Sequence, residues 1–184
     1  MKKDKLWKGR INRAADSSAE KFTASIGVDR VLYMQDITGT AAHVIGLEDI
    51  GILKESELKE ILAGLKKVAD KVAAGKTNFE NYEDIHSLVE YELAKIIKKS
   101  SEKIHTGRSR NDQVVLDELL YLKESTVLLL ERLIELEAVI VRKAEKNMGL
   151  VFPAYTHLQK AQPVLVSHYL LSYFDKFSRN IKNY

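Results

Sequence analysis

The chain contains no cysteine and only two prolines among its 184 residues. The lack of cysteine removes disulfides, thiolate metal ligands and cysteine nucleophiles from the possible chemistries. The scarcity of proline leaves long stretches that are free to form uninterrupted helices. No segment reaches the ~18 uninterrupted apolar residues of a membrane span, so we expect no membrane partner.

Neither sign of charge dominates, because 29 basic residues face 26 acidic ones and the formal net charge is +3. This near balance gives no general reason to expect nucleic acid or a membrane surface as a partner, and any preference for anions must be local. The basic N-terminal stretch MKKDKLWKGR lacks the apolar run of a signal peptide, so we expect a cytoplasmic protein. A hydrophobic content of 45% is typical of a globular domain with a real core.

Helical periodicity accounts for most of the chain. Between residues 55 and 74, and again between residues 83 and 99, apolar side chains recur every three or four positions, as they do on the buried face of a helix. Gly75 supplies a stop for the first of these helices. No alternating pattern of β-branched residues competes, so we predict an all-α fold.

The longest predicted helix runs from residue 111 to residue 147, a stretch that contains neither proline nor glycine. At ~1.5 Å per residue it makes a rod of roughly 55 Å. Its leucine-rich middle, STVLLLERLIELEAVIVRK, is apolar on more than one side, which suits burial among several helices and across a subunit interface. We expect an N-terminal helical domain at residues 1–110 and the start of a truncated long-helix bundle domain at residues 111–184.

Local signals suggest further helix ends. Ser17 has the spacing of a capping box with the glutamate three positions later, and Asp29 is expected to begin another helix. Pro153 and Pro163 bracket a polar loop, PAYTHLQKAQ, and Pro163 is expected to begin a helix, since a missing N–H costs nothing at the first position. The apolar face of that helix is unfinished at Tyr184, which favours a cut chain over a frayed natural terminus.

Four polar clusters interrupt the apolar scaffold: Ser25 in FTASIGVD, YEDIH at 82–86, HTGRSRND at 105–112 and YTHLQ at 155–159. They are far apart in sequence. Antiparallel helices return to the same end of a bundle, so we expect these distant clusters to be able to meet.

The HTGRSRND cluster gathers cationic groups at the start of the longest helix. Arg108 and Arg110 offer planar guanidinium groups that match carboxylates, and Ser109 or Asn111 could cap the helix while its backbone N–H groups face an anion. The acidic Asp112 would not help to bind a phosphate backbone, and the cluster contains no aromatic residues on which bases could stack. Both observations argue against a nucleic-acid partner. The pattern favours a carboxylate cradle, and a solvated basic loop is the plainer alternative.

Histidine is the side chain best able to exchange protons near neutral pH, and His157 lies in the YTHLQ cluster after Thr156. A histidine in such a place is also often structural. His86 follows Asp84 by two positions on a predicted helix, and we interpret it as an orienting partner for a loop or a neighbouring acid. The sequence shows neither an HExxH motif nor a close cluster of histidine and aspartate, so no metal and no cofactor are expected.

The motifs resemble those of the argininosuccinate lyases, a branch of the fumarase/aspartase superfamily. HTGRSRNDQ is the most specific match, and it is supported in order by WKGR (7–10), DITGTAAH (36–43), EDIH (83–86) and YTHLQKAQP (155–163). The resemblance covers nearly the whole chain, as the N-terminal part of such an enzyme. It implies the all-α, long-helix fold of that superfamily.

The resemblance also implies an activity: cleavage of 2-(Nω-L-arginino)succinate to fumarate and L-arginine, in arginine biosynthesis and the urea cycle. It implies a homotetramer in which residues from three subunits form each active site. Three regions of the sequence contribute to that site, and this chain contains two of them. Carried over position by position, it assigns His157 as the catalytic histidine. The substrate-binding positions that it implies are Ser25, Asn111 and Thr156, with Arg108, Arg110 and Ser109 in the wall of the site.

Two departures from the family pattern leave alternatives open. Lys8 and Ile11 stand where the family usually has glycine and phenylalanine. The family's mobile signature loop, with its serine base and a lysine, is expected beyond residue 184, so the 184-residue chain alone is expected to show no turnover. A sister lyase acting on another fumaryl adduct is one alternative. A non-catalytic relative, like the lens crystallins that keep this fold, is another, because the site residues can persist in it.

Overall fold

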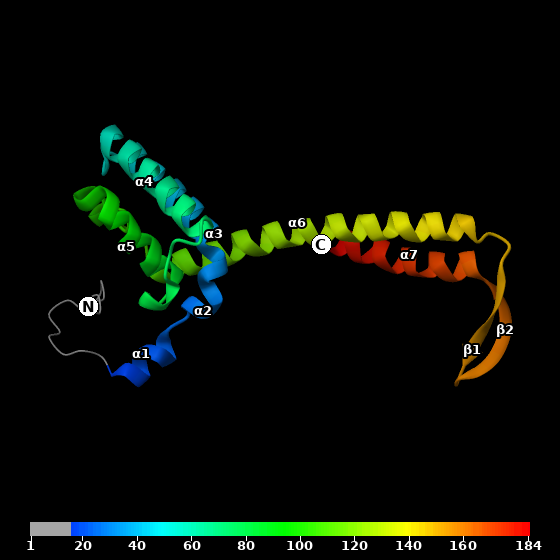
Figure 1. Cartoon of the computed structure of the whole chain (residues 1–184). Helices are drawn as coiled ribbons and strands as arrows, with labels where there is room; N and C mark the ends of the chain where they lie inside the picture. Colours follow the sequence, from blue (N-terminus) through cyan, green and yellow to red (C-terminus); the bar gives the residue numbers. More distant parts are fainter. Residues whose placement is uncertain (1–15) are drawn as a thin grey trace. The chain divides into compact units, whose positions relative to one another are not determined.

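The computed structural model describes residues 16–184, apart from the side chains of Ser17 and Lys98. Most of these residues are helical, and a two-stranded antiparallel sheet lies between the last two helices of the chain (Figure 1). The chain divides into two compact units, Met1–Tyr121 and Leu122–Tyr184. The all-α prediction is confirmed, with the small sheet as an addition that the sequence pattern did not indicate. The motif WKGR (7–10), with the departures at Lys8 and Ile11, lies outside the described residues.

The first unit contains three longer helices together with several short helices and 3₁₀ turns. In chain order they are α1 (Ser17–Thr23), α2 (Ile26–Asp29), the 3₁₀ turn η1 (Arg30–Leu32), α3 (Tyr33–Asp49), α4 (Glu55–Ala73), η2 (Phe79–Asn81), α5 (Ile85–Ile97) and η3 (Lys98–Lys103). The helix α6 (Arg110–Lys146) begins in this unit and continues into the second. Its bounds are close to the predicted range of 111–147. The second unit is completed by β1 (Val151–Thr156), β2 (Gln159–Leu165) and α7 (Val166–Asn183).

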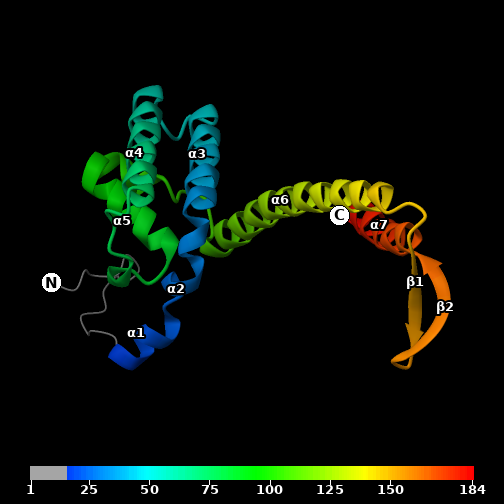
Figure 2. The ribbon, with the colours of Figure 1, turned by 45° about the vertical axis from the view of Figure 1, so that its right-hand side comes forward.

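The helices α3, α4 and α5 pack side by side around the core of the first unit (Figure 2). Ile61 and Leu65 of α4, and Leu88 and Leu93 of α5, are at most 1% exposed, on the apolar faces that the periodicity predicts. Each such side chain contributes about 1.5–3 kcal/mol when removed from water. Gly64 lets α4 and α5 approach closely, because a Cβ at this position would lie 2.6 Å from Leu93 Cδ1.

The start of α6 carries a cap of the kind that the sequence predicts. Ser109 Oγ accepts a hydrogen bond from the backbone N–H of Asn111 at 3.2 Å, and the Asp112 carboxylate accepts one from the backbone N–H of Ser109 at 3.3 Å. This arrangement is a variant of the capping box in which the serine caps the second N–H of the helix and the N3 aspartate caps the N–H of the serine, so two N–H groups are satisfied. Of the two caps left open by the sequence, Ser109 is the one used.

Two helix starts near the N-terminus differ from prediction. The cap at Ser17 is wrong: Asp16 precedes α1, and its carboxylate accepts a backbone hydrogen bond from that helix at 2.8 Å. Helical backbone begins at Ile26, earlier than the predicted start at Asp29. The Asp29 carboxylate instead accepts a hydrogen bond from the backbone N–H of Ile85 at 3.1 Å, a tertiary contact that local spacing does not encode.

The second unit departs furthest from the sequence pattern. Strands β1 and β2 pair antiparallel, with Pro153 opposite Pro163, where the sequence predicts a polar loop followed by a helix start. That prediction is wrong, and α7 begins at Val166. Each strand of a two-stranded sheet has an open edge, so the missing N–H of a proline need not break the pairing.

Aromatic contacts join the hairpin to α7 in the second unit, where α6 and α7 lie side by side (Figure 1). The ring of Phe152 on β1 packs edge-on against Tyr169, with centroids 5.4 Å apart, and Tyr169 packs in the same way on Tyr173 at 5.2 Å. On α6, Ile140 and Ala144 are buried. Among residues 16–184, no helix has the length and apolar character needed to cross a membrane.

Candidate active site

Three helices of the first unit bring three titratable side chains together. Asp36 of α3, His86 of α5 and Asp117 of α6 are 1%, 2% and 0% exposed. His86 Nδ1 lies 2.9 Å from Asp36 Oδ1 and 3.3 Å from Asp117 Oδ2. No such cluster of histidine and aspartate is visible in the sequence, because the fold joins residues that are distant along the chain.

His86 is held in its charged form by these two acids. Burial lowers the pKa of the imidazole, but hydrogen bonds to Asp117 and Asp36 outweigh burial and raise the pKa of His86 to about 9. Burial also raises the pKa of Asp117, against the hydrogen bond from His86. His86 therefore orients neighbouring acids, as the sequence interpretation has it.

The same three side chains could in principle hold a metal ion, since one ligand atom from each lies within 4.8 Å of the others. Two observations disfavour a cation there. Asp36 Oδ1 already accepts a hydrogen bond from Gln113 Nε2. Arg108 lies close enough for Asp36 and Asp117 to act on its pKa, so imidazolium and guanidinium together balance the two carboxylates.

Arg108 reaches from the loop before α6 back to α3. Its Nη1 donates to Thr40 Oγ1 at 3.2 Å, whereas its Nε and Nη2 are buried and have no hydrogen-bond partner among residues 16–184. Burial lowers the pKa of this guanidinium, and the acids Asp36 and Glu90 oppose that effect. Buried N–H groups without a partner cost free energy, and a ligand carboxylate would remove that cost.

Arg110, the first residue of α6, is held from two sides. Its Nη1 donates to Gln113 Oε1 at 2.8 Å and lies 2.9 Å from Glu90 Oε1 on α5. Sequence reasoning missed both partners. One signal was available for Gln113, because a spacing of three residues on a helix places its side chain beside Arg110. The partner on α5 depends on tertiary packing.

The remaining predicted residues of this unit lie at the starts of two helices, α2 and α6. Ser25 precedes α2 and is exposed, its Oγ donates to the Asp29 carboxylate at 2.6 Å, and its backbone N–H donates to the Glu83 carbonyl at 2.9 Å. The FTASIGVD and YEDIH clusters therefore meet. Ser109 and Asn111 are exposed at the start of α6.

A cavity of about 1020 Å³ opens beside α5, η3 and the start of α6. Its wall mixes acids with bases, and burial lowers the pKa of His105 in that wall. Such a wall suits a ligand that carries charges of both signs. The charged and titratable lining residues are Glu83, Asp84, Glu90, Lys99, Glu102, His105 and Arg110.

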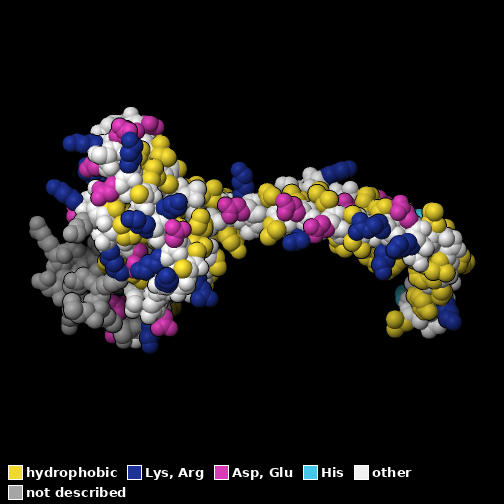
Figure 3. Space-filling view, turned by 45° about the horizontal axis from the view of Figure 1, so that its top comes forward, with side chains coloured by type: hydrophobic (Ala, Val, Ile, Leu, Met, Phe, Trp, Pro, Cys, Tyr) yellow, Lys and Arg dark blue, Asp and Glu magenta, His cyan; other side chains and the backbone are white. Residues whose placement is uncertain are grey.

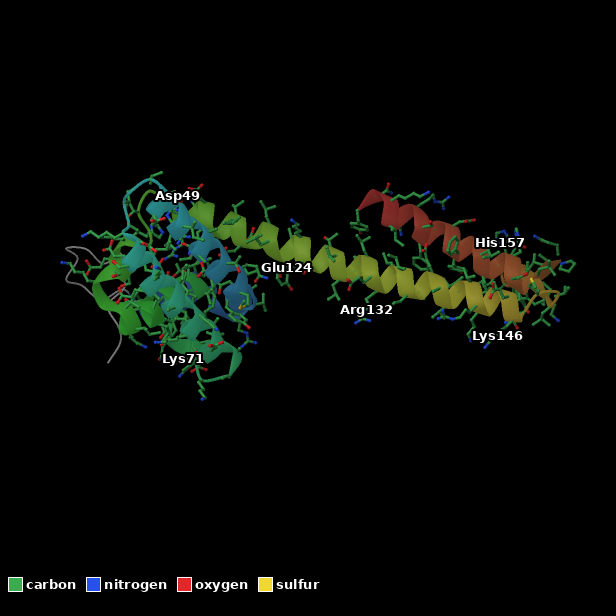
Figure 4. All side chains as sticks on the ribbon, turned by 90° about the horizontal axis from the view of Figure 1, so that it is seen from above. Asp49, Lys71, Glu124, Arg132, Lys146 and His157 are labelled. Atoms are coloured by element: carbon green, nitrogen blue, oxygen red, sulfur yellow. The ribbon has the colours of Figure 1, made fainter. Side chains whose placement is uncertain are left out.

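Thr156 and His157 belong to the second unit, in which Figure 4 labels His157. Thr156 ends β1 opposite Gln159, and His157 and Leu158 form the turn with φ of 51° and 61°. Two consecutive left-handed residues are usual for Asn-Gly and strained for His-Leu. Thr156 and His157 are exposed, and the structure places them in a different unit from the five other predicted site residues.

Comparison with known proteins identifies the class to which this arrangement belongs. A family model described as Lyase matches residues 9–184, and the chain belongs to this family. Among curated relatives, the argininosuccinate lyases of Geobacter sulfurreducens and Desulfatibacillum aliphaticivorans are 44% and 41% identical over 98% of this chain. That of Listeria innocua is 43% identical over 97%. The chain spans about 40% of the length of these curated relatives.

Solved structures show the same fold. A variant EDDS lyase with bound fumarate is 26% identical, with a TM-score of 0.73 over 92% of this chain and 34% of that chain. The β-carboxy-cis,cis-muconate cycloisomerase of Acinetobacter calcoaceticus is 17% identical, with a TM-score of 0.69 over 88% of this chain and 39% of that chain. The second likeness concerns the fold alone.

Proposed function

We propose that this chain is part of an argininosuccinate lyase, which cleaves 2-(Nω-L-arginino)succinate to fumarate and L-arginine. The observation that carries the proposal is the 41–44% identity to argininosuccinate lyases over almost the whole chain. Two arginines of the HTGRSRND motif support it: Arg108 is half-buried, and Arg110 is held by Gln113. The succinyl part of the substrate carries carboxylates, which bind to such guanidinium groups.

The reaction is a β-elimination. A base removes a proton from the succinyl Cβ, the C–N bond to the guanidino nitrogen breaks, the double bond of fumarate forms, and the leaving nitrogen regains a proton. The intermediate carries two negative charges on one carboxyl group. Donors aimed at that group stabilise the transition state more than the ground state. Arg108, with two buried nitrogens that lack partners among residues 16–184, offers donors of this kind.

His157 is assigned the role of proton donor and acceptor, or of orienting one. The substrate-binding positions assigned with it are Ser25, Ser109, Asn111 and Thr156. The exposed imidazole on a hairpin turn supports this assignment, because a projecting side chain is accessible to a ligand.

A homotetramer whose active sites each draw on three subunits fits this assignment. It would bring residues from separate units into one site and cover the exposed apolar side chains of α6. We assign the protein to the cytoplasm and to arginine biosynthesis and, where it operates, the urea cycle. Within the proposed domain organisation, residues 1–110 form the N-terminal domain and residues 111–184 begin the helical bundle.

A sister lyase acting on another fumaryl adduct is the second candidate. The observation that favours it is the 26% identity to EDDS lyase across 92% of this chain. The non-catalytic relative is the third, and it differs from both lyases in releasing no fumarate.

The test is fumarate release from argininosuccinate by the protein expressed from its complete gene. Release establishes the reaction, and no release contradicts it. Protection of the protein against thermal unfolding by arginine serves as the control, because only a protein with an arginine site gains stability by mass action. Arginine protection without fumarate release would indicate the non-catalytic relative. The absence of both effects would favour the sister lyase.

A further inference from the structure

Gln113 connects the buried acids to the surface of the candidate site. Its side chain is 1% exposed, its Nε2 donates to Asp36 Oδ1, and its Oε1 accepts from Arg110 Nη1 at 2.8 Å. Behind Asp36 lies His86, at 2.9 Å from the same carboxylate oxygen. A continuous series of contacts therefore runs from the core, through one amide, to a guanidinium in the cavity wall.

The buried acid decides which end of the amide faces Arg110. An ionised carboxylate only accepts hydrogen bonds, so the NH₂ group of Gln113 must point at Asp36 and its oxygen must point away. A guanidinium only donates, so that oxygen is the end that Arg110 requires. His86 Nδ1 lies 2.9 Å from the same carboxylate oxygen, so Asp36 Oδ1 accepts from both of its neighbours, and the amide keeps this polarity.

Among residues 16–184, the hydrogen bond and the ion pair of Arg110 both use a single nitrogen, Nη1. Nη1 carries two hydrogens, and its contacts with Gln113 Oε1 and Glu90 Oε1 occupy this one nitrogen. The edge formed by Nε and Nη2 lies outside this clamp. That edge is the fork with which an arginine binds a carboxylate through two parallel hydrogen bonds.

We infer that Gln113, itself oriented by Asp36 and His86, is a positioning residue that aims the free edge of Arg110 at a substrate carboxylate. The inference rests on the proposed function, since it takes the ligand to be a dicarboxylate. Arg108, two positions earlier, gives a contrast, because its Nη1 donates to Thr40 Oγ1 and not to Gln113.

The experiment is a double-mutant cycle on kcat/KM for argininosuccinate in the protein from its complete gene. Gln113→Met removes both polar ends of the side chain at similar volume, and Arg110→Lys removes the fork while keeping the charge. We expect Gln113→Met to lower kcat/KM about tenfold in the unaltered background and hardly at all beside Arg110→Lys, because it acts through Arg110. The matched control is the cycle of Gln113→Met with Arg108→Lys, which should be additive.

Two results would overturn the assignment. One is an additive Gln113–Arg110 cycle, and the other is equal coupling to both arginines, as a general loosening of the loop would produce. If Gln113→Met does not fold, Gln113→Asn replaces it, since it keeps the amide but cannot span both partners.

The proposed function can fail separately. If the unaltered protein releases no fumarate, the position of Arg110 in a crystal structure of the Gln113→Met variant decides the matter. A displaced guanidinium would support the positioning role of Gln113, and an unmoved one would refute it.

Discussion

His157 combines an exposed imidazole with a left-handed backbone. Its φ is 51°, and Leu158 beside it has φ of 61°. Most side chains avoid this region, and asparagine tolerates it better than most. Substitution by asparagine therefore removes the group that exchanges protons while keeping the turn that presents it.

We predict that His157→Asn, in the protein from its complete gene, lowers kcat for argininosuccinate by about 10²–10⁴-fold and changes KM much less. The neighbouring Leu158→Asn change is the control, because it occupies the same turn without touching the imidazole. Steady-state kinetics of both variants check the prediction. An unchanged kcat in His157→Asn would refute the catalytic role.

His86 makes stability depend on pH. Its pKa in the folded protein, about 9, lies above its ordinary value of 6.5 because of the Asp117 and Asp36 hydrogen bonds, which outweigh burial. The folded state therefore binds more protons than the unfolded state between these values. The stabilisation is fully present below about pH 6.5 and is lost as the pH rises through about 9.

We expect the free energy of unfolding, from urea titrations, to fall across this window by at most about 1.4 kcal/mol per pH unit. His86→Gln removes the titrating group, so its unfolding free energy should be lower at neutral pH and flatter across the same window. A variant with the unaltered slope would assign the dependence to other groups.

At the scale of elements, the close approach of α4 to α5 depends on Gly64. A Cβ at this position would lie 2.6 Å from Leu93 Cδ1 and 3.0 Å from Ile97 Cγ2, whereas a Cβ at Gly46 of α3 would meet nothing within 4 Å. The two glycines thus share a helical setting and differ in what surrounds them.

We predict that Gly64→Ala destabilises the protein by about 1–3 kcal/mol, as overpacking does, although alanine is the better helix former. Gly46→Ala should stabilise it by up to about 1 kcal/mol, which is the difference in helix propensity alone. Denaturant unfolding of both variants measures the contrast. Equal effects would show that α4 and α5 separate at little cost.

The hairpin shows how tertiary context overrides a local pattern. Pro163 is a good first residue for a helix, and the structure instead places it opposite Pro153 in a sheet. The edge-on contact of Phe152 with Tyr169 ties the hairpin to α7. Rules that consider only a few neighbouring residues do not detect this contact, because Phe152 and Tyr169 lie 17 positions apart.

At the scale of the whole molecule, the apolar surface of α6 bears on assembly. In the second unit, Leu122, Leu129 and Leu136 are 58%, 45% and 39% exposed. They recur every seven residues, so they lie along one side of the helix. Figure 3 shows yellow hydrophobic side chains exposed along this helix among charged ones. If the proposed homotetramer forms, we expect this stripe to lie in an interface between subunits, because large exposed apolar patches commonly mark protein-binding surfaces.

We predict that Leu129→Glu combined with Leu136→Glu lowers the mass of the assembled protein in sedimentation, because each buried carboxylate would have to leave water without a partner. Arg132→Ala is the control. Its side chain is 68% exposed and pairs with Glu135 of the same helix, so the mass should stay unchanged. An unaltered mass in the double variant would exclude this stripe from the interface.

The sequence by itself determined the features that depend on neighbours along the chain. Apolar periodicity predicts α4 and α5, and the stretch without proline or glycine predicts α6, each to within about two residues at either end. The sequence also names Ser109 as one of two possible caps of α6. The motifs also identify the lyase family, because their residues and their order along the chain can be compared without knowing the fold. Helix hydrogen bonds join residues four positions apart, so helix formation depends mainly on residues that are close in the sequence.

Tertiary structure decided which of the polar residues meet. His86 and Asp36 lie 50 positions apart, and Gln113 and Asp36 lie 77 apart, yet each pair shares a hydrogen bond. Both depend on how α3, α5 and α6 pack, and packing is chosen by the burial of the whole apolar surface at once. The family motifs name Arg108 and Arg110, whereas the contacts of Arg108 with Thr40 and of Arg110 with Glu90 exist only once the helices have come together.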